Sequence, residues 1–85
     1  MATASTPWGT ATVVDEVVLA QQVEGRRFGS LVQLLETKKG ERLVRFAYST
    51  GGIARRGPVT LRARDLERLR ALLDEHTALK EVLMP

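Results

Sequence analysis

Residues 42–83 read RLVRFAYSTGGIARRGPVTLRARDLERLRALLDEHTALKEVL, and the spacing of their apolar residues changes within this stretch. Residues 42–49 alternate between the two faces of a predicted strand. From residue 62 onward the leucines recur every three or four positions, which is the period of an amphipathic helix. The alternation predicts that the core face of the strand carries Val44, Phe46 and Tyr48.

The predicted C-terminal helix starts between residues 61 and 64, where Thr60 is the nearest residue of a good capping type. A break is expected near His76-Thr77. A small sheet cannot readily cover a leucine stripe as wide as this one, and the surplus predicts a homodimer formed through the helix. The expected dimer-interface residues are Leu66, Leu69, Leu73, His76 and Leu83.

Upstream of residue 42 the sequence predicts two more strands. The segment from Thr10 to Val23 is rich in β-branched residues, which favour strands over helices. The apolar run from Phe28 to Thr37 is the next strand, and residues 38–41, KKGE, indicate a hairpin loop after it. Downstream, residues 53–61 form a short or edge strand because Pro58 cannot donate to a ladder.

These elements predict an α+β fold, an antiparallel β-meander of about four strands followed by a C-terminal amphipathic helix. With 85 residues the chain has room for a single core, which we place in residues 10–85. Residues 1–9 are predicted to be a disordered tail because they are small, uncharged and have little to bury. A chain this short is marginally stable alone, and the absence of cysteine leaves self-association as the favoured supplement.

Charge is segregated along the chain. The formal net charge is +3, yet residues 26–70 hold twelve bases against four acids, a local balance of +8. Ten of the thirteen bases are arginines, which suit bidentate contacts with phosphate and stacking on bases. This concentration favours a polyanionic partner, and the alternative is an ordinary solvated surface.

The basic residues outside the helix form three groups close to turns, which could converge on one face or rim of the sheet. Arg45 lies on the strand face opposite Phe46 and could join them where a polynucleotide crosses the sheet. The helix arginines have acids beside them, so we interpret them as solvated. The predicted nucleic-acid-binding residues are Arg26, Arg27, Lys38, Lys39, Arg45, Tyr48, Arg55 and Arg56.

The sequence indicates a protein that is not an enzyme and needs no cofactor, metal or small-molecule substrate. His76 is the one candidate base for any serine, and its place on the apolar stripe favours a packed or interface histidine. Asp15 and Glu16 face opposite sides of a strand and cannot act as a pair. The glycines lack the spacing of a phosphate-binding loop.

No membrane partner is expected, because the longest apolar-leaning run, residues 13–20, is interrupted by Asp15 and Glu16. A membrane helix needs about 20 apolar residues. We therefore expect a cytoplasmic protein, nucleoid-associated if it is bacterial.

From Arg27 to Leu83 the chain resembles the single-strand-binding transcriptional coactivator domain of the positive cofactor four type and its small bacterial relatives. The resemblance is carried by residues 55–61, RRGPVTL, which match the family's basic entry into the helix, and by the Lys39-Gly40 turn. It implies a meander followed by a helix, and a homodimer that binds single-stranded DNA across its sheets. Arg55 and Arg56 would then bind the DNA backbone, and Lys39 would contact a phosphate. Thr37 or Lys38 stands where the family has a hairpin aromatic, which leaves Tyr48 or Trp8 for base stacking.

The sequence therefore predicts a single-stranded nucleic-acid-binding protein with a transcription-regulatory or nucleoid-associated role, which contacts mainly phosphates. DNA and RNA both remain candidate partners. The alternative is a protein-protein interaction or scaffold module without a nucleic-acid role, in which the helix stripe and strand edges engage a partner chain.

Overall fold

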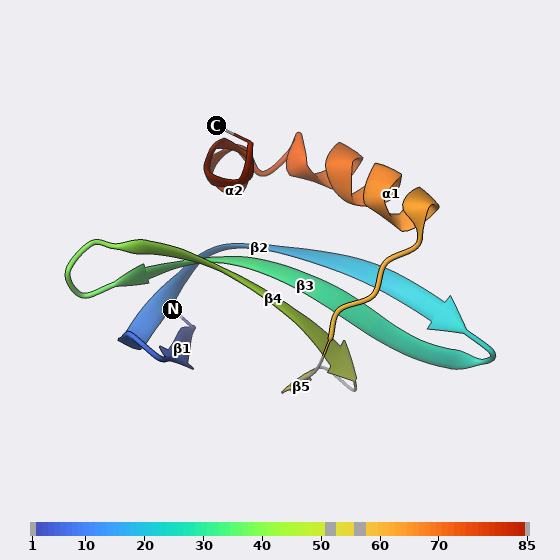
Figure 1. The fold of residues 1–85 in the computed structure, drawn as a ribbon, viewed down its shortest axis with the longest axis horizontal. Coiled ribbons are helices and arrows are strands. Elements are labelled where there is room, and N and C mark those ends of the chain that lie inside the picture. Colours follow the sequence, from blue (N-terminus) through green and yellow to red (C-terminus); the bar gives the residue numbers. More distant parts are fainter. Residues whose placement is uncertain (1, 51–52, 56–57, 85) are drawn as a thin grey trace.

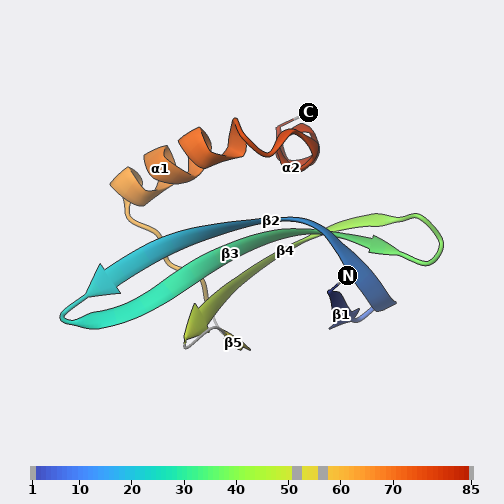
Figure 2. The same cartoon turned by 180° about the vertical axis from the view of Figure 1, so that it is seen from behind.

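The computed structural model describes residues 2–50, 53–55 and 58–84. Five antiparallel strands follow one another in the sheet in chain order, so the fold is α+β with a β-meander (Figure 1). Two short helices lie on one side of the curved sheet and β1 lies on the other (Figures 1 and 2). The elements are β1 (Thr3–Thr6), β2 (Gly9–Val23), β3 (Arg26–Thr37), β4 (Arg42–Thr50), β5 (Ile53–Arg55), α1 (Ala63–Leu73) and α2 (Thr77–Leu83).

The first strand corrects the prediction of a disordered tail, which is wrong for Thr3–Thr6. These residues pair with Gly9–Thr12 of β2 across a tight turn. Pro7 stands at the second turn position, and Gly9 closes the turn with a φ of 103°, which favours glycine. The Thr6 hydroxyl donates to the Gly9 carbonyl oxygen at 2.6 Å and accepts the Trp8 N–H at 3.1 Å. Turn chemistry therefore orders a segment that has little to bury.

The β2–β3 hairpin forms the long spine of the sheet. Its two-residue turn, Glu24-Gly25, has positive φ at both positions, 49° and 79°, as the turns that suit a twisted hairpin require. The two strands pair from Val23 opposite Arg26 to Ala11 opposite Thr37, with a bulge between Val13 and Asp15. A bulge bends the strand that carries it.

The core occupies both faces of the sheet, which explains why residues 29–35 of β3 are all buried instead of alternating. The buried residues form two clusters that share no residue. The cluster under the helices contains Val17, Leu19, Val32, Leu34, Leu69, Leu73 and Leu79. The smaller cluster under β1 contains Ala4, Ala11 and Leu35.

The predicted core face of β4 is only partly correct. Val44 packs against the cluster under the helices and Tyr48 is half-buried, but Phe46 is 53% exposed. The main contacts of the helices are with β2 and β3, so the helices do not cover Phe46 on the next strand. Ala47, on the opposite face, is buried instead.

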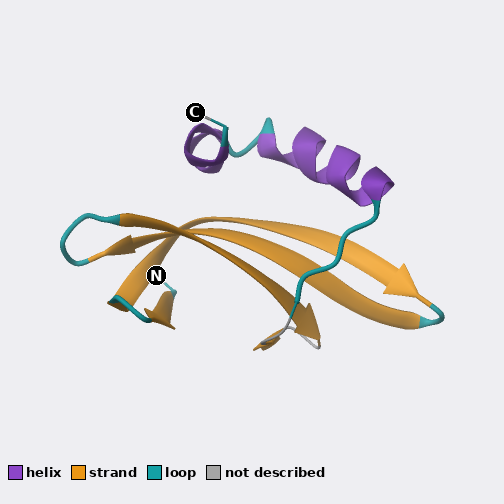
Figure 3. Ribbon diagram, in the orientation of Figure 1, coloured by secondary structure: helices purple, strands orange, loops and turns teal. Residues whose placement is uncertain are grey.

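The helix and its predicted break are confirmed, because α1 ends at Leu73 and α2 begins at Thr77. The His76 Nδ1 atom lies 2.7 Å from Asp15 Oδ1 and links this break to β2. Residues 58–62 form the extended connection that leads to α1 (Figure 3). Within the described ranges, neither helix has the length and apolar character to cross a membrane.

Candidate nucleic-acid interface

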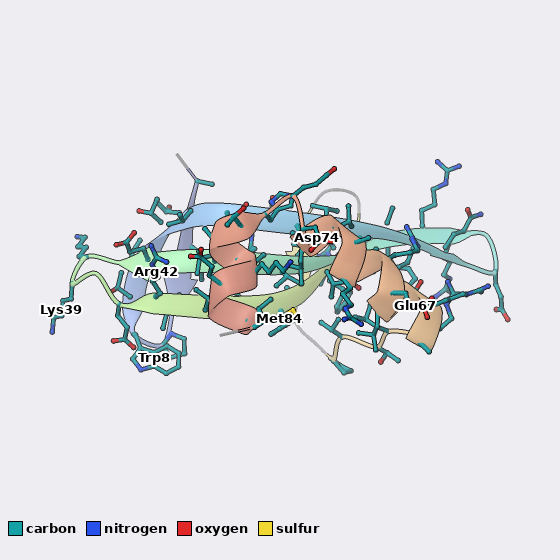
Figure 4. The ribbon with its side chains drawn as sticks, turned by 90° about the horizontal axis from the view of Figure 1, so that it is seen from above. Trp8, Lys39, Arg42, Glu67, Asp74 and Met84 are labelled. Carbon is teal, nitrogen blue, oxygen red and sulfur yellow. The ribbon has the colours of Figure 1, made fainter. Side chains whose placement is uncertain are left out.

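The three predicted basic groups do not all converge, because Lys38 and Lys39 lie at the opposite end of the sheet from Arg26. Arg26 and Arg27 begin β3, whereas Lys38 and Lys39 follow its last residue. A strand of 12 residues rises about 3.3 Å per residue, so its ends lie about 36 Å apart. Successive turns of a meander alternate between the two ends of the sheet, and Figure 4 shows Lys39 at one extreme of the molecule.

Two of the predicted residues do meet in a groove at the Arg26 end. The groove has a volume of about 620 Å³ and opens between β3, β4 and the connection to α1. Its lining comprises Glu24, Arg26, Phe28, Ser30, Tyr48 and Pro58–Thr60. The groove therefore combines one guanidinium, two aromatic rings and two hydroxyl side chains, with the Glu24 carboxylate at the turn as its acid.

Arg55 lies beside this groove because β5 places it directly opposite Tyr48. Its Nε donates to Thr50 Oγ1 at 3.0 Å, and the side chain is exposed. Arg56, the other member of the predicted pair, lies outside the described residues. Arg55 therefore lies with Arg26 and Tyr48 at one end of the sheet.

A second, smaller groove lies at the opposite end of the sheet. Its volume is about 420 Å³, and it brings Trp8 together with Lys38 and Lys39. Trp8 is 66% exposed, so its ring face is accessible. Glu41 also lines this groove. Each end of the sheet therefore presents an aromatic ring together with basic side chains.

Arg45 lies on the face of β4 opposite Tyr48, as the alternation predicts, and so stands apart from both grooves. Its Nε donates to Gln33 Oε1 at 2.8 Å. Gln33 Nε2 in turn donates to Glu16 Oε1 at 2.7 Å. This chain of side chains crosses three neighbouring strands and fixes the guanidinium.

Arg62 and Arg68 are exposed, in agreement with the interpretation of the helix arginines as solvated, but both also contact the buried Asp65, which the sequence interpretation did not include. Asp65 is fully buried and accepts hydrogen bonds from the Arg62 backbone N–H at 3.1 Å, from Arg62 Nε at 3.0 Å and from Gln21 Nε2 at 3.1 Å. Arg68 Nη1 lies 3.6 Å from Asp65 Oδ1, and Arg68 Nη2 donates to the Ala20 carbonyl oxygen at 3.1 Å. The signal in the sequence was an acid three residues after one arginine and three before another.

The hydrogen bonds between Asp65 and Arg62 also shift the pKa values of these two residues. The hydrogen bond from the Arg62 guanidinium is the main cause that lowers the pKa of Asp65 to about 2, against the opposing effect of burial. The same bond raises the pKa of Arg62. Asp65 is therefore charged at the start of α1. Its side chain caps the helix by accepting the backbone N–H of Arg62, the N-cap residue, so the capping residue is not the predicted Thr60.

Most of the predicted dimer residues have partners within the chain. Leu69 and Leu73 are buried under the helices, and Leu83 packs against the same cluster. His76 contacts Asp15. Leu66, which is 52% exposed, is the member of the set that remains available to another molecule.

Among the described residues, no group of three or more histidine, cysteine, aspartate or glutamate side chains is placed to hold a metal ion. Comparison with family models, with curated proteins and with solved structures finds no match to this chain.

Proposed function

We propose that the protein binds single-stranded nucleic acid, and that the groove beside Tyr48 is its principal contact. The observation that supports this function is the meeting of Arg26, Tyr48 and Arg55, which come from three different strands, at one end of the sheet. A guanidinium on each side of an aromatic ring suits a backbone phosphate on either side of a stacked base.

The same geometry favours single strands over duplex. The cations lie at a hairpin turn and on a short edge strand, and a flexible backbone can adapt to such scattered positions. A duplex needs an element that enters its groove, usually a helix. Here α1 is attached along the sheet by Arg68 and Asp65. A transcription-regulatory or nucleoid-associated role is part of this proposal.

A homodimer is also part of the proposal, with a smaller surface than the sequence predicted. Among the described residues from α1 to the C-terminal side of α2, the large apolar side chains that remain exposed are Leu66 and Met84. Light scattering at micromolar concentration tests this part. A dimer that Leu66→Glu dissociates supports it, and the mass of one chain contradicts it.

Titration of a fluorescent single strand of about 12 nucleotides, followed by anisotropy at two salt concentrations, tests the binding function. We expect affinity to fall with salt, with a log–log slope of about 0.7 for each phosphate contacted. The double variant Arg26→Glu with Arg55→Glu should weaken binding at least about tenfold, since two phosphate contacts are lost and two like charges introduced.

The matched control is Arg64→Glu with Arg70→Glu, which makes the same change of net charge on the exposed face of α1. This pair should weaken binding far less. Equal effects of the two pairs would mean that net charge alone governs affinity and that the groove is not the site. Equal affinity for duplex and single strand at matched salt would contradict the preference for single strands.

One observation favours the alternative function, a protein-interaction module. Phe46 and Trp8 are both largely exposed, and both line a groove along β4 that contains no predicted phosphate-binding loop. No binding of single strands even at low salt, together with binding of a protein partner, would select this alternative.

A further inference from the structure

Part of the outer edge of β4 presents backbone groups without a strand partner. The Thr37 N–H donates to the Glu41 carbonyl oxygen at 2.9 Å, which fixes the alternation of the β3–β4 ladder. Leu43, Arg45 and Ala47 then bond toward β3, while the N–H and C=O groups of the residues between them point outward. Because β5 pairs only with Tyr48–Thr50, the outward residues without a partner strand in the described chain are Arg42, Val44 and Phe46.

The other long edge of the sheet, on β2, is interrupted at two places. Beyond the bulge at Val13/Asp15, the outward Ala20 carbonyl accepts a hydrogen bond from Arg68. A bulge and a covering charged side chain are two devices by which proteins block unwanted strand addition. The β4 edge has neither, because its register with β3 is continuous and no described side chain bonds to its outward groups.

A groove of about 310 Å³ runs beneath this open edge. It lies between the β1–β2 turn, Ser5–Trp8, and the segment Leu43–Phe46. Seen from above, β4 forms one border of the sheet, and Trp8 lies beside that border (Figure 4). Arg45 is the one ionisable side chain among the lining residues, so the groove is cationic and lacks a carboxylate.

The two faces of β4 differ in chemistry along this edge. Val44 and Phe46 present apolar surface on the side of the helices, whereas Arg45 presents a guanidinium on the side of the groove. Side chains of an added strand alternate between these two sides. The edge is therefore complementary to a strand in which apolar and acidic residues alternate.

We propose that the outer edge of β4 binds an extended peptide segment of a partner protein, in which apolar and acidic residues alternate, by addition of a sixth strand. The segment forms backbone hydrogen bonds with Val44 and Phe46, packs an apolar side chain on the Phe46 ring and places a carboxylate on Arg45. The proposal is independent of nucleic-acid binding, which uses the ends of the sheet.

A second copy of this chain fits the edge less well. In antiparallel self-pairing centred on Val44, each Arg42 would face Phe46 of the other copy. That ribbon would then hold Arg42 and Arg45 of both copies with no acid on the paired segment, and like charges on neighbouring strands are destabilising. An acidic segment neutralises these charges instead.

The test uses a capped peptide in which valine and glutamate alternate. Its length is about eight residues, which is a usual strand length. Its titration into the isotope-labelled protein is followed by amide chemical shifts and hydrogen exchange. We expect shifts centred on Val44 and Phe46, and increased protection of their amides. A peptide that alternates valine and lysine should bind at least about tenfold more weakly.

Two proline variants locate the binding edge. Phe46→Pro removes one outward N–H and an exposed ring without breaking a bond to β3, and an edge strand tolerates proline. It should weaken the peptide at least about tenfold. Val18→Pro is the matched control, because Val18 is also 53% exposed and, two residues before Ala20, points its N–H outward from the β2 edge. It should leave binding unchanged.

Two further variants keep the proposal testable if Phe46→Pro does not fold. Phe46→Ala should weaken both peptides through loss of the ring, and Arg45→Gln should remove the preference for glutamate over lysine. The proposal is overturned by an unperturbed β4 edge at millimolar peptide, by equal effects of the two proline variants, or by β4 amides already protected in a dimer of the free protein. Phe46→Ala should leave the affinity for the oligonucleotide unchanged, so peptide binding at β4 and nucleic-acid binding are tested independently.

Discussion

At the scale of the single residue, Asp65 ties the helix to the sheet. Its carboxylate is fully buried and receives hydrogen bonds from Arg62 and Gln21, so it stabilises the fold in its charged form. The pKa falls from the usual 3.8 to about 2 in the folded chain. The unfolded chain therefore takes up the proton first as the pH falls, and this contribution to stability is present above about pH 4 and lost between about pH 4 and pH 2.

We predict that Asp65→Asn lowers the melting temperature at pH 7 by on the order of 5 °C or more, because an amide cannot replace the charge that Arg62 and Arg68 face. The variant should also lose less stability than the native protein between pH 4 and pH 2. Thermal melts followed by circular dichroism across this range provide the measurement.

The control for this prediction is Asp74→Asn. The Asp74 carboxylate accepts a hydrogen bond from Lys80 Nζ, which is the main cause of its lowered pKa, but the pair is exposed. Solvent screens such pairs, so this substitution should change the melting temperature only slightly. Similar melting temperatures for both variants would show that the buried network is no more important than a surface pair.

At the scale of the element, the β2–β3 turn carries backbone strain at Glu24, which a substitution can relieve. Glu24 adopts a φ of 49°, a left-handed conformation that asparagine tolerates much better than glutamate. We predict that Glu24→Asn stabilises the protein by about 0.5–1 kcal/mol in urea unfolding. The control Glu24→Gln removes the charge but not the strain, and should not stabilise.

The same two variants separate the turn from the groove that it borders. Both remove the carboxylate at the groove rim, so both should tighten oligonucleotide binding by a similar factor. Tighter binding with Asn alone would instead point to the geometry of the turn. Stabilisation by Gln as well as by Asn would contradict the argument from φ.

The elements show which sequence signals were sufficient. β-Branched and apolar composition was enough to predict β2 and β3, and hydrophobic period was enough to predict β4 and the broken helix. Period gave no signal for β1, which forms through the Thr6–Gly9 turn and the backbone of β2. The alternation in β4 identified which residues share a face, but whether Phe46 is covered depends on where the helices lie.

At the scale of the whole molecule, the candidate site could be predicted only in part. The sequence shows that bases gather near turns, and Arg26, Tyr48 and Arg55 do lie together. Which turns share an end depends on strand order and length, and these separate Lys38 and Lys39 from that group. Arg62 and Arg68 bond instead to the buried Asp65, which Gln21 of β2 also contacts, and Arg68 donates in addition to the Ala20 carbonyl oxygen.

If single-stranded nucleic acid binds as proposed, the separation of the two basic ends makes the affinity depend on the length of the oligonucleotide. A strand of about 4 nucleotides can reach one groove, whereas one of about 16 can extend over the sheet and engage both. The second contact is then intramolecular, and its effective concentration raises the affinity without any new groove. We predict that affinity rises from the short to the long strand by more than the number of added binding registers explains.

The double variant Lys38→Glu with Lys39→Glu isolates this effect, because it changes net charge by the same amount as Arg26→Glu with Arg55→Glu. The lysine pair should reduce affinity for the long strand toward that of the short one and hardly change the short one, which binds at the Arg26 end. The arginine pair should weaken both. Anisotropy titrations with both lengths at one salt concentration measure all four cases. If the lysine pair weakens the short strand as much as the long one, the two ends do not act as separate contacts, and the long axis of the sheet is not the path of the nucleic acid.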